Sequence, residues 1–293
     1  MTNERSAASA TRRPTGDPDT FLIPEEHLPP GFAEKVESGG WEPVPPRPAA
    51  TVVLLREAAG GPEALLLRRH RRSGFAADAW VFPGGVVDPG DRDPALAAWL
   101  DGPDPAGWAA RLGLDDPAEA QGYVAAALRE AFEETGILLA RPDGAAPEAL
   151  EAARRTLLAG EAGLREVAEE RAARLAGDAL VYLAHWITPE PEPRRYDTRF
   201  FAARVSPGAE CTVHEREMTD AVWMAPAVAV ARFHAGEMKM LPPTVRTLAR
   251  LAEHRTLPAL WEALRDAPVP AVLPRMRRHP GGVAIELPKN DGT

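Results

Sequence analysis

The sequence predicts an α/β (α+β) fold in which helices cover a mixed central sheet. Short apolar runs with β-branched residues, such as TVVLL at 51–55, alternate along the chain with segments whose apolar residues recur at helical spacing. Strands and helices are mixed over the whole length, and no internal repeat is present. The 45% apolar and 26% charged residues are ordinary for a soluble globular protein, so the core can be substantial.

The net charge limits the kinds of partner that the protein can bind, and the cysteine content indicates its cellular compartment. A net charge of −9 and a pI of about 5.4 argue against a broad basic surface for nucleic acid. Cys211 is the only cysteine, which excludes an internal disulfide and a cysteine zinc cluster and suits a reducing compartment. No transmembrane run and no secretory pattern is visible, so we expect a cytoplasmic protein without a membrane partner.

The first third of the chain is expected to start with a flexible arm, because residues 1–48 are rich in Pro, Gly, Ser and charge. Residues 51–55 and 64–67 predict a hairpin of buried strands around a Gly-rich turn. A short strand at 79–82 then runs into Pro-Gly-Gly, and DPGDRDP at 88–94 is a loop with strong turn chemistry.

One long helix is predicted in the middle of the chain. Asp115-Asp116 offers an N-cap, Pro117 suits the first helical position, and Gly136 suits the position after the last turn. The apolar stripe consists of Val124, Leu128, Ala131 and Phe132. Gly122 weakens the first turns, and residues 137–139 are predicted as a strand edge beyond the helix.

The second half of the chain is predicted to add further strands and helices. Strands are predicted at 180–187, 196–205 and 221–224, and helical patterns at 147–176, 226–236 and 243–254. The expected organisation is a flexible N-terminal arm over 1–48, one domain over 49–266 with helical insertions at about 92–117 and 145–177, and a C-terminal tail over 267–293 with one weak strand at 283–287.

The segment LREAFEETG, residues 128–136, concentrates acidic groups on one helical face. Glu130, Glu133 and Glu134 are spaced so that their side chains lie together on a helix. Like charges that close repel one another, so the segment is either a solvated acidic face or a place where a cation is held. Carboxylate oxygens are ligands that Mg²⁺ favours, and glutamates at i, i+3 and i+4 can meet one or two such ions.

The glycines at 84–85 and REAFEETGI at 129–137 together resemble the Nudix box. In that family a glycine is followed after five residues by Glu, and after seven more by Arg-Glu-U-x-Glu-Glu-x-Gly-U, where U is a bulky aliphatic residue. Gly85 matches the first glycine. The second half is matched by Arg129, Glu130, Glu133, Glu134, Gly136 and Ile137.

Three departures distinguish the chain from that pattern. Asp91 stands where the family has glutamate, and Ala131 fills the first aliphatic position. The gap from Asp91 to Arg129 holds 37 residues instead of seven, an insertion of 30 residues. Because loop-closure entropy grows slowly with length, an insertion that extends this loop is tolerable. We expect Asp91 either to reach a metal through water or to brace Arg129.

The long insertion is also similar to that of one Nudix subfamily, typified by a peroxisomal coenzyme A diphosphatase of animals. HWITPEPEPRRYDTRFF at 185–201 and LPPT at 241–244 resemble segments of that subfamily, and the likeness covers about residues 50–255. An arginine-rich motif of other coenzyme A hydrolases is matched only loosely, because Asp78 stands at one of its glycines. A peroxisomal location is not carried over.

The resemblance implies a Nudix-type α/β/α sandwich and a hydrolase that uses Mg²⁺ or Mn²⁺ to cleave a phosphoric anhydride bond. Glu130, Glu133 and Glu134 would be the metal ligands. Arg129 would orient a glutamate or the loop through a charge-assisted hydrogen bond. The cation would relieve the repulsion within the acidic cluster and acidify a water molecule.

A further carboxylate is expected from a later loop. Glu217 lies six residues before Trp223 and fits this role as a metal ligand, with Glu215 and Asp220 as competitors. Either Glu134 or Glu217 would serve as the general base. The alternative interpretation of Glu217 is an ordinary surface residue.

Glycines and arginines are expected to contact the substrate. Gly84 and Gly85 would let the backbone approach the site closely. Arg69, in the run RRHRR, would contact a phosphate such as the 3′-phosphate of coenzyme A, and the alternative is a solvated stretch. Arg195 and Arg199 lie beside or on a strand expected to line the pocket.

The function expected from this resemblance is pyrophosphate hydrolysis. The substrate would be a nucleoside diphosphate joined to another moiety, with coenzyme A or acyl-coenzyme A favoured, which would give 3′,5′-ADP and a phosphopantetheine. ADP-ribose, NADH or another dinucleotide is the runner-up. A non-catalytic nucleotide-binding module that regulates a partner is the alternative from another class, and the intact glutamates argue against it. A homodimer is left open.

Overall fold

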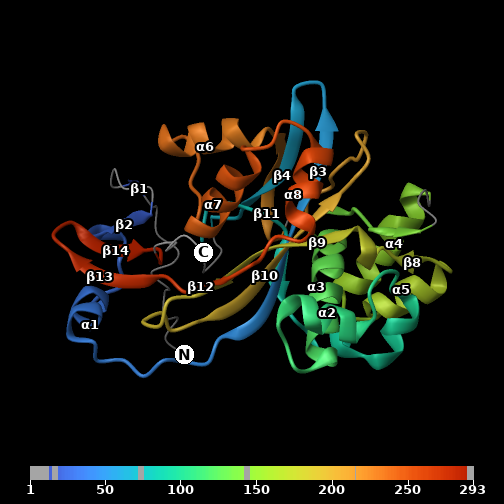
Figure 1. Ribbon diagram of the computed structural model, residues 1–293, viewed down its shortest axis with the longest axis horizontal. Coiled ribbons are helices and arrows are strands. Elements are labelled where there is room, and N and C mark those ends of the chain that lie inside the picture. The colour runs from blue at the N-terminus through green and yellow to red at the C-terminus, as the bar shows by residue number, and fades with distance from the viewer. Residues whose placement is uncertain (1–12, 15–18, 72–75, 142–145, 215, 289–293) are drawn as a thin grey trace.

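The fold is organised around a mixed sheet that crosses the middle of the molecule (Figure 1). The computed structural model describes residues 13–14, 19–71, 76–141, 146–214 and 216–288. The sheet contains β3 (Arg47–Ala58), β4 (Gly61–Arg69), β5 (Trp80–Val81), β6 (Gly84–Val86), β9 (Leu180–Ile187), β10 (Tyr196–Arg204), β11 (Met218–Met224) and β12 (Ala271–Val272). Within the described ranges the strand order is β11–β4–β3–β10–β9–β12, with β5 on β4 and β6 on β3. Strand β10 runs parallel to β3 and antiparallel to β9, so the sheet is mixed, as predicted.

Helices cover both faces of this sheet. One face carries α2 (Pro105–Leu112) and α3 (Pro117–Thr135), and the other carries α6 (Pro226–His234), α7 (Pro242–Leu251) and α8 (Leu257–Arg265). In β3, Val52 and Leu54 pack in the core with α2 and α3, whereas Val53 and Leu55 pack in the core with α6 to α8. A strand buried on both faces needs an uninterrupted apolar run, which explains TVVLL. The architecture is the expected α/β/α sandwich.

Helix α3 has the predicted bounds and caps. The carboxylate of Asp116 accepts a hydrogen bond from the backbone N–H of Ala118 at 2.9 Å. Gly136 ends the helix in the left-handed region, with φ of 74°. Strand β9 also has its predicted bounds, and β10 and β11 differ from the predicted strands only at their ends.

Two local predictions on the α3 side of the sheet are refined or overturned. Residues 137–139 are not a strand edge, because pairing begins with β7 (Ala140–Arg141), which lies against β8 (Arg174–Leu175). The helical pattern at 147–176 resolves into α4 (Pro147–Leu158) and α5 (Leu164–Glu170). Gly160, with φ of 69°, marks the break between them.

Helix α8 was not among the elements that the sequence predicted. Its buried residues are Leu257, Leu260 and Leu264. Their spacing is helical, but Thr256 and a proline at the start of this short segment resemble a loop. The carboxylate of Glu57 accepts a hydrogen bond from the backbone N–H of Leu257 at 3.2 Å, so α8 is anchored to the far end of β3.

Segments near both ends of the described chain form a second sheet. Residues 19–48 contain a strand and a helix, contrary to the expected flexible arm, whereas the strand predicted at 283–287 is confirmed. The second sheet contains β1 (Arg13–Pro14), β2 (Thr20–Pro24), β13 (Arg275–His279) and β14 (Gly282–Glu286), in the order β1–β2–β14–β13, and α1 (Phe32–Ser38) packs on it. Phe21 and Ile23 are buried here, so β2 gains apolar contacts that residue composition does not reveal. Residues 1–12, 15–18 and 289–293 lie outside the described ranges.

The segment inserted in the Nudix box forms compact structure beside α3. It includes the short turns of 3-10 helix η3 (Pro89–Arg92) and η4 (Pro94–Trp99), followed by α2. Across the described ranges, no helix combines the length and the apolar character needed to cross a membrane.

Candidate active site

Arg129, near the C-terminal end of α3, is held in place by Asp91. Its Nε lies 3.0 Å from Asp91 Oδ1 and its Nη2 lies 3.0 Å from Asp91 Oδ2, a two-point contact. Nη2 also donates to the carbonyl oxygen of Val86 at 2.8 Å. Asp91 is 2% exposed, and its carboxylate accepts a further hydrogen bond from the backbone N–H of Asp88. Of the two roles expected for Asp91, the structure shows the contact that braces Arg129.

The long gap inside the box closes because η3 packs directly on α3. The side-chain amide of Gln121 donates to the carbonyl oxygen of Asp93 at 2.7 Å. A Cβ on Gly122 would lie only 2.8 Å from Val87 Cγ1, so this approach requires glycine. The residue that weakens the helix locally is therefore the one that admits the inserted segment.

The three glutamates of α3 contact two different groups. Arg129 Nη1 donates to Glu130 Oε1 at 2.8 Å and to Glu133 Oε2 at 3.2 Å. Glu134 is buried and accepts a hydrogen bond from the backbone N–H of Gly84 at 3.2 Å. The acidic cluster thus connects α3 to the start of β6.

The glycines at the start of β6 allow a close approach to α3 and to β3. A Cβ on Gly85 would lie 2.2 Å from Glu130 Oε1, and a Cβ on Gly84 would lie 2.6 Å from the carbonyl oxygen of Ala50. Both distances are shorter than any tolerable contact. A side chain at either position would displace the glutamate or break the pairing of β6 with β3.

The three glutamates have raised pKa values, because burial disfavours their charged forms. Burial raises the pKa of Glu130 to about 7, and the charge of Arg129 opposes this rise only in part. Burial likewise raises the pKa of Glu133. The pKa of Glu134 lies well above its usual range, chiefly because of burial and then because of the charge on Glu130. An added cation would lower all three pKa values.

A divalent cation fits the donor atoms of this cluster. Carboxylate oxygens suit Mg²⁺ and Mn²⁺. Among the described residues, no three His, Cys, Asp or Glu side chains converge in an arrangement ready to hold a metal ion. The reason is that Glu130 and Glu133 are turned towards Arg129, and Glu134 towards Gly84. A cation would compete with Arg129 for the first two glutamates.

A loop before β11 is fastened to the C-terminal end of α3. The backbone N–H of Thr212 donates to the carbonyl oxygen of Thr135 at 2.9 Å. The backbone N–H of His214 donates to the carbonyl oxygen of Glu134 at 3.3 Å. These bonds satisfy carbonyl groups that a helix end leaves without partners, and they fix where the loop passes the acidic cluster.

Glu217 lies at the end of this loop, directly before β11. Its carbonyl oxygen accepts a hydrogen bond from the backbone N–H of His70 at 2.8 Å, and its charge helps to raise the pKa of Glu134. The Glu217 side chain is exposed. Of the two competitors, Asp220 lies on β11 and accepts a hydrogen bond from the next backbone N–H, and Glu215 lies outside the described residues.

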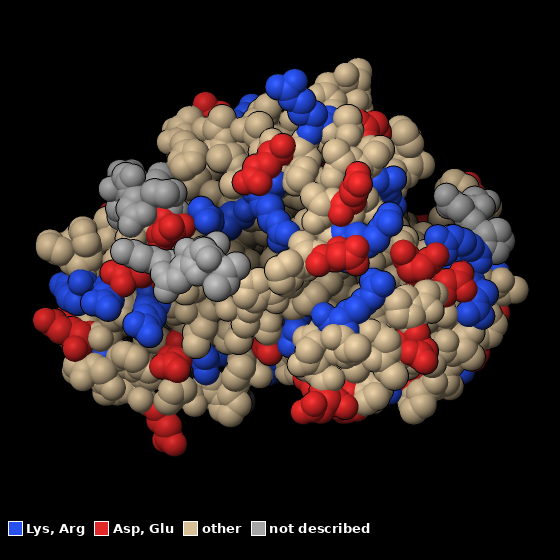
Figure 2. Space-filling model, viewed as in Figure 1, with Lys and Arg blue, Asp and Glu red and all other residues tan. Residues whose placement is uncertain are grey.

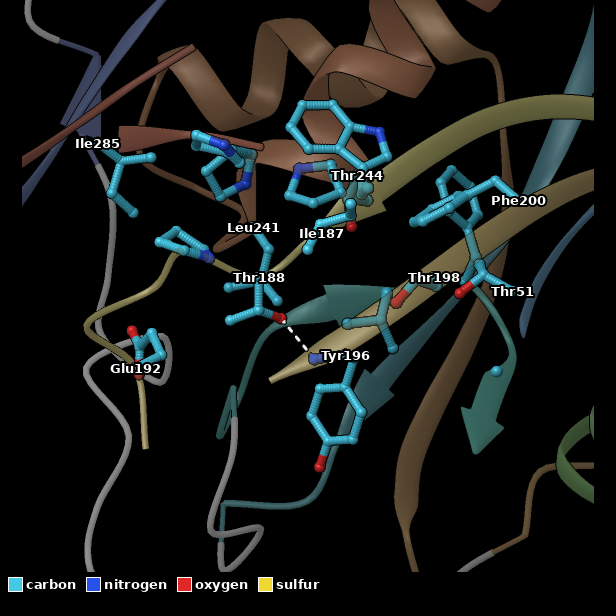
Figure 3. A pocket seen from close by; sticks show the side chains of 18 of the residues that line it. Thr51, Ile187, Thr188, Glu192, Tyr196, Thr198, Phe200, Leu241, Thr244 and Ile285 are labelled. Atoms are coloured by element: carbon cyan, nitrogen blue, oxygen red, sulfur yellow. Dashed lines mark hydrogen bonds between the residues drawn. The ribbon is translucent and has the colours of Figure 1, made fainter. Parts of the chain in front are cut away.

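A cavity of about 190 Å³ (Figure 3) includes Gly84 in its lining, whereas the α3 glutamates are not among its described lining residues. Gly84, whose N–H contacts Glu134, lines it together with Arg69 and Thr51. In the space-filling view, Lys and Arg side chains border a hollow near the middle of the face (Figure 2). The cavity thus meets the acidic cluster at Gly84.

Arg69, at the end of β4, presents a guanidinium group to this cavity. Its Nε is buried and has no hydrogen-bond partner among the described groups. Its positive charge partly opposes the rise in the pKa of Glu134. A buried donor that lacks a partner inside the protein is suited to an anionic ligand.

Strand β10 sends alternate side chains to the cavity. Those that line it are Tyr196, Thr198 and Phe200. Arg199 points to the opposite face, as the period of a strand requires. Its Nη1 donates to the carbonyl oxygen of Leu112 at 2.6 Å and to the hydroxyl of Tyr182 at 2.8 Å. The structure therefore does not bring Arg199 to the cavity, contrary to the prediction.

Arg195 is also engaged away from the cavity. Its Nε donates to the carbonyl oxygen of Thr188 at 3.0 Å, and its Nη1 donates to that of Val44 at 2.8 Å. It is not among the described residues that line the cavity. These bonds give Arg195 a structural role, because they tie the turn before β10 to the segment before β3.

His185, Trp186 and Cys211 each pack within the fold. His185 Nε2 lies 2.6 Å from Asp197 Oδ1 within the sheet. Trp186, the next residue, lines the cavity. Burial raises the pKa of the Cys211 thiol to about 11, which keeps it protonated and unreactive near neutral pH.

Some residues of the cavity were missed by sequence reasoning. The alternation of Tyr196, Thr198 and Phe200 was a usable signal, because these residues share one face of a predicted strand. Met276 and Ile285 also line the cavity, but they come from the chain-end sheet. No local pattern relates that sheet to the glutamates, so the sequence offered no signal for these two residues.

Comparisons with known proteins match this geometry. The family described as the NUDT19 Nudix domain matches residues 117–251, and the NUDIX domain matches residues 45–99. The acyl-coenzyme A diphosphatase NUDT19 of Gallus gallus is 32% identical over 274 residues, which cover 75% of this chain and 71% of that protein. The Homo sapiens protein of the same name is 29% identical over 265 residues, covering 77% of this chain and 69% of that protein.

A solved structure shares the fold. The NUDIX hydrolase from Alicyclobacillus acidocaldarius superposes with a TM-score of 0.62 at 27% sequence identity, and the match covers 77% of this chain and 99% of that chain. The sandwich, the box on α3 and these likenesses define a hydrolase that acts on diphosphate bonds. The chain belongs to the Nudix hydrolase family.

Proposed function

We propose that this Nudix hydrolase is a Mg²⁺- or Mn²⁺-dependent pyrophosphohydrolase of coenzyme A or acyl-coenzyme A. The products would be 3′,5′-ADP and a phosphopantetheine. The observation that carries the proposal is the position of Glu134, which contacts Gly84, a residue that lines the cavity. The relatives named acyl-coenzyme A diphosphatase support the choice of substrate.

The acidic residues would bind the metal ion and accept a proton at the reacting diphosphate. A bound divalent cation would neutralise the diphosphate oxygens and acidify a water molecule. Glu130, Glu133 and Glu134 would hold it, and Glu217 would add a carboxylate from the facing loop. Glu134 or Glu217 would then accept the proton of the attacking water.

The basic residues have separate tasks. Arg129 would keep Glu130 and Glu133 oriented, because its guanidinium group is itself fixed by Asp91. Arg69 would bind a substrate phosphate with its buried and unpaired Nε. A phosphate at this position lies between the acidic cluster and the cavity, so Arg69 would offset the repulsion that the glutamates exert on it.

The test is hydrolysis of a substrate panel by the purified protein. Coenzyme A, an acyl-coenzyme A, ADP-ribose, NADH and nucleoside triphosphates would be incubated with Mg²⁺, with Mn²⁺ or with EDTA, and the products identified by mass spectrometry. The proposal expects 3′,5′-ADP from coenzyme A species only when a metal is present. Preferential turnover of ADP-ribose or NADH would reject the substrate, and no turnover of any compound would favour a binding module.

A further inference from the structure

The far wall of the cavity is built by the chain-end sheet and not by the residues of the Nudix box. Met276 on β13 and Ile285 on β14 both line the cavity, and they are register partners across the hairpin. Pro274, just before β13, lines it as well. Ile285 is in turn paired with Phe21 of β2, so both ends of the chain support this wall.

The cavity is polar at one end and mainly apolar along the rest. Thr51 and Gly84 are register partners in β3 and β6 at the end next to Glu134, and Arg69 also lines the cavity. Away from that end, the lining includes Ile187 and Leu241, and Figure 3 shows Ile285 on the side opposite Thr51. A diphosphate held at the glutamates would therefore send one of its two substituents along an apolar path.

The chemistry of the far end distinguishes between the two halves of coenzyme A. The adenosine half carries a 3′-phosphate, which needs cationic or hydrogen-bond-donating partners. Met276, Ile285 and Pro274 supply no side-chain donors for such a group. The acylated pantetheine half ends in an aliphatic chain, which gains free energy from burial against such side chains.

We propose that the cavity receives the acylated pantetheine arm of the substrate, and that Met276 and Ile285 limit the length of the acyl chain. This inference rests on the proposed function, because it assumes that the diphosphate of an acyl-coenzyme A is bound at the α3 glutamates. The chain-end sheet is then the part of the molecule that sets acyl selectivity.

The test compares wall variants on substrates that differ only in the acyl group. Ile285→Phe fills the far end, and Met276→Ala enlarges it. The measured quantity is the ratio of kcat/KM for a long-chain acyl-coenzyme A to kcat/KM for free coenzyme A. We expect Ile285→Phe to lower this ratio by about tenfold and Met276→Ala to raise it, since pocket size discriminates aliphatic chains by this order.

Phe21→Leu is the matched control. Phe21 is buried in the same sheet and pairs with Ile285, but it is outside the described lining of the cavity. The control should keep the wild-type ratio. Thermal melting of each variant shows whether it is folded, and if Ile285→Phe fails to fold, Met276→Ala alone decides the question.

The outcomes separate this inference from the proposed function. If the wild-type protein cleaves coenzyme A species but the wall variants leave the ratio unchanged, the acyl site is wrong and the proposed function stands. An equal change in the ratio for Phe21→Leu would overturn the acyl site as well. If the wild-type protein cleaves no coenzyme A species, both proposals fall together.

Discussion

At the scale of single residues, the candidate site depends on carboxylates that the protein has buried close together. Glu130 and Glu133 share one guanidinium nitrogen of Arg129, while Glu134 turns to a backbone N–H of Gly84. Burial raises the pKa of each glutamate, which is unfavourable for a charged group without a counterion. Such an arrangement is expected where a cation binds, and it makes each carboxylate testable.

Removing the charge of one glutamate should abolish turnover but preserve the fold. Glu133→Gln and Glu134→Gln keep side-chain volume and remove an anionic ligand, so we expect kcat to fall by about two orders of magnitude or more. The melting temperature should stay near that of the wild type. Glu148→Gln, at an exposed position on α4, is the control. A Glu134→Gln enzyme with the wild-type rate would reject the assignment.

Asp91 should matter for stability because it pairs with Arg129 in a buried position. Asp91→Asn removes the charge that compensates the guanidinium group, and breaking a buried pair on one side costs about 3–5 kcal/mol. Urea unfolding should therefore show a lower free energy of unfolding. The exposed Asp115 provides a control in Asp115→Asn, which should change it by less than about 0.5 kcal/mol. Equal stability of both variants would contradict the bracing role.

At the scale of elements, α4, a helix outside the Nudix box, braces α3. Arg154 of α4 is 3% exposed, and its Nε and Nη2 donate to the carbonyl oxygen of Glu133 at 2.9 Å and 2.8 Å. The guanidinium group thereby places positive charge at the C-terminal end of α3, where the helix dipole is negative. The inserted helix is thus part of the support for the acidic cluster.

Loss of this brace should affect catalysis through geometry. Arg154→Met keeps much of the side-chain bulk but leaves the Glu133 carbonyl oxygen without these donors, so we expect a fall in kcat of about tenfold with little change in KM. Arg155→Met, one position along α4 and exposed, is the matched control. If both variants retain the wild-type kcat, α4 has no role in holding the cluster.

Local sequence patterns were sufficient for the elements that carry the box. The Asp116 cap, Pro117 and Gly136 delimited α3, because caps act through neighbouring backbone groups. The sequence left two roles open for Asp91, because the 37 residues between Asp91 and Arg129 conceal whether the two side chains meet. The sequence predicted a strand around Arg199 but not which of its residues face the cavity. Since neighbouring residues of a strand point to opposite faces of the sheet, the prediction put Arg199 on the wrong face.

At the scale of the whole molecule, two helical layers and a sheet position the site, and the chain ends complete it. The pairing of β2 with β14 joins residues more than 250 positions apart, for example Phe21 and Ile285. Composition and periodicity indicate the secondary structure of a segment. They cannot reveal which distant segment it pairs with. For this reason the sequence predicted the catalytic helix but not the wall of the cavity.

The stability of the whole fold should depend on pH and on metal through the acidic cluster. Burial raises the pKa of Glu130 from 4.5 to about 7, so the folded protein holds this proton more tightly than the unfolded chain. Without metal, stability should therefore fall as pH rises from about 4.5 to about 7. The melting temperature, measured in EDTA, should therefore decrease across this pH range. This decrease should be smaller in the Glu130→Gln variant.

Added Mg²⁺ should reverse this loss, because it binds the ionised carboxylates of the folded state. The rise in melting temperature should be larger at about pH 8 than at about pH 5, where protons compete with the cation. A rise that is independent of pH would indicate that the cation binds elsewhere.

Because β13 and β14 come late in the sequence, the wall they form is synthesised long after α3. A nascent chain has all of α3 and its glutamates long before Met276 and Ile285 leave the ribosome. Until then the acidic helix can fold beside β3, but the chamber next to it stays open on one side. If Met276 and Ile285 limit the acyl chain as proposed, discrimination between acyl groups would be acquired last, after α3 and its glutamates have been made.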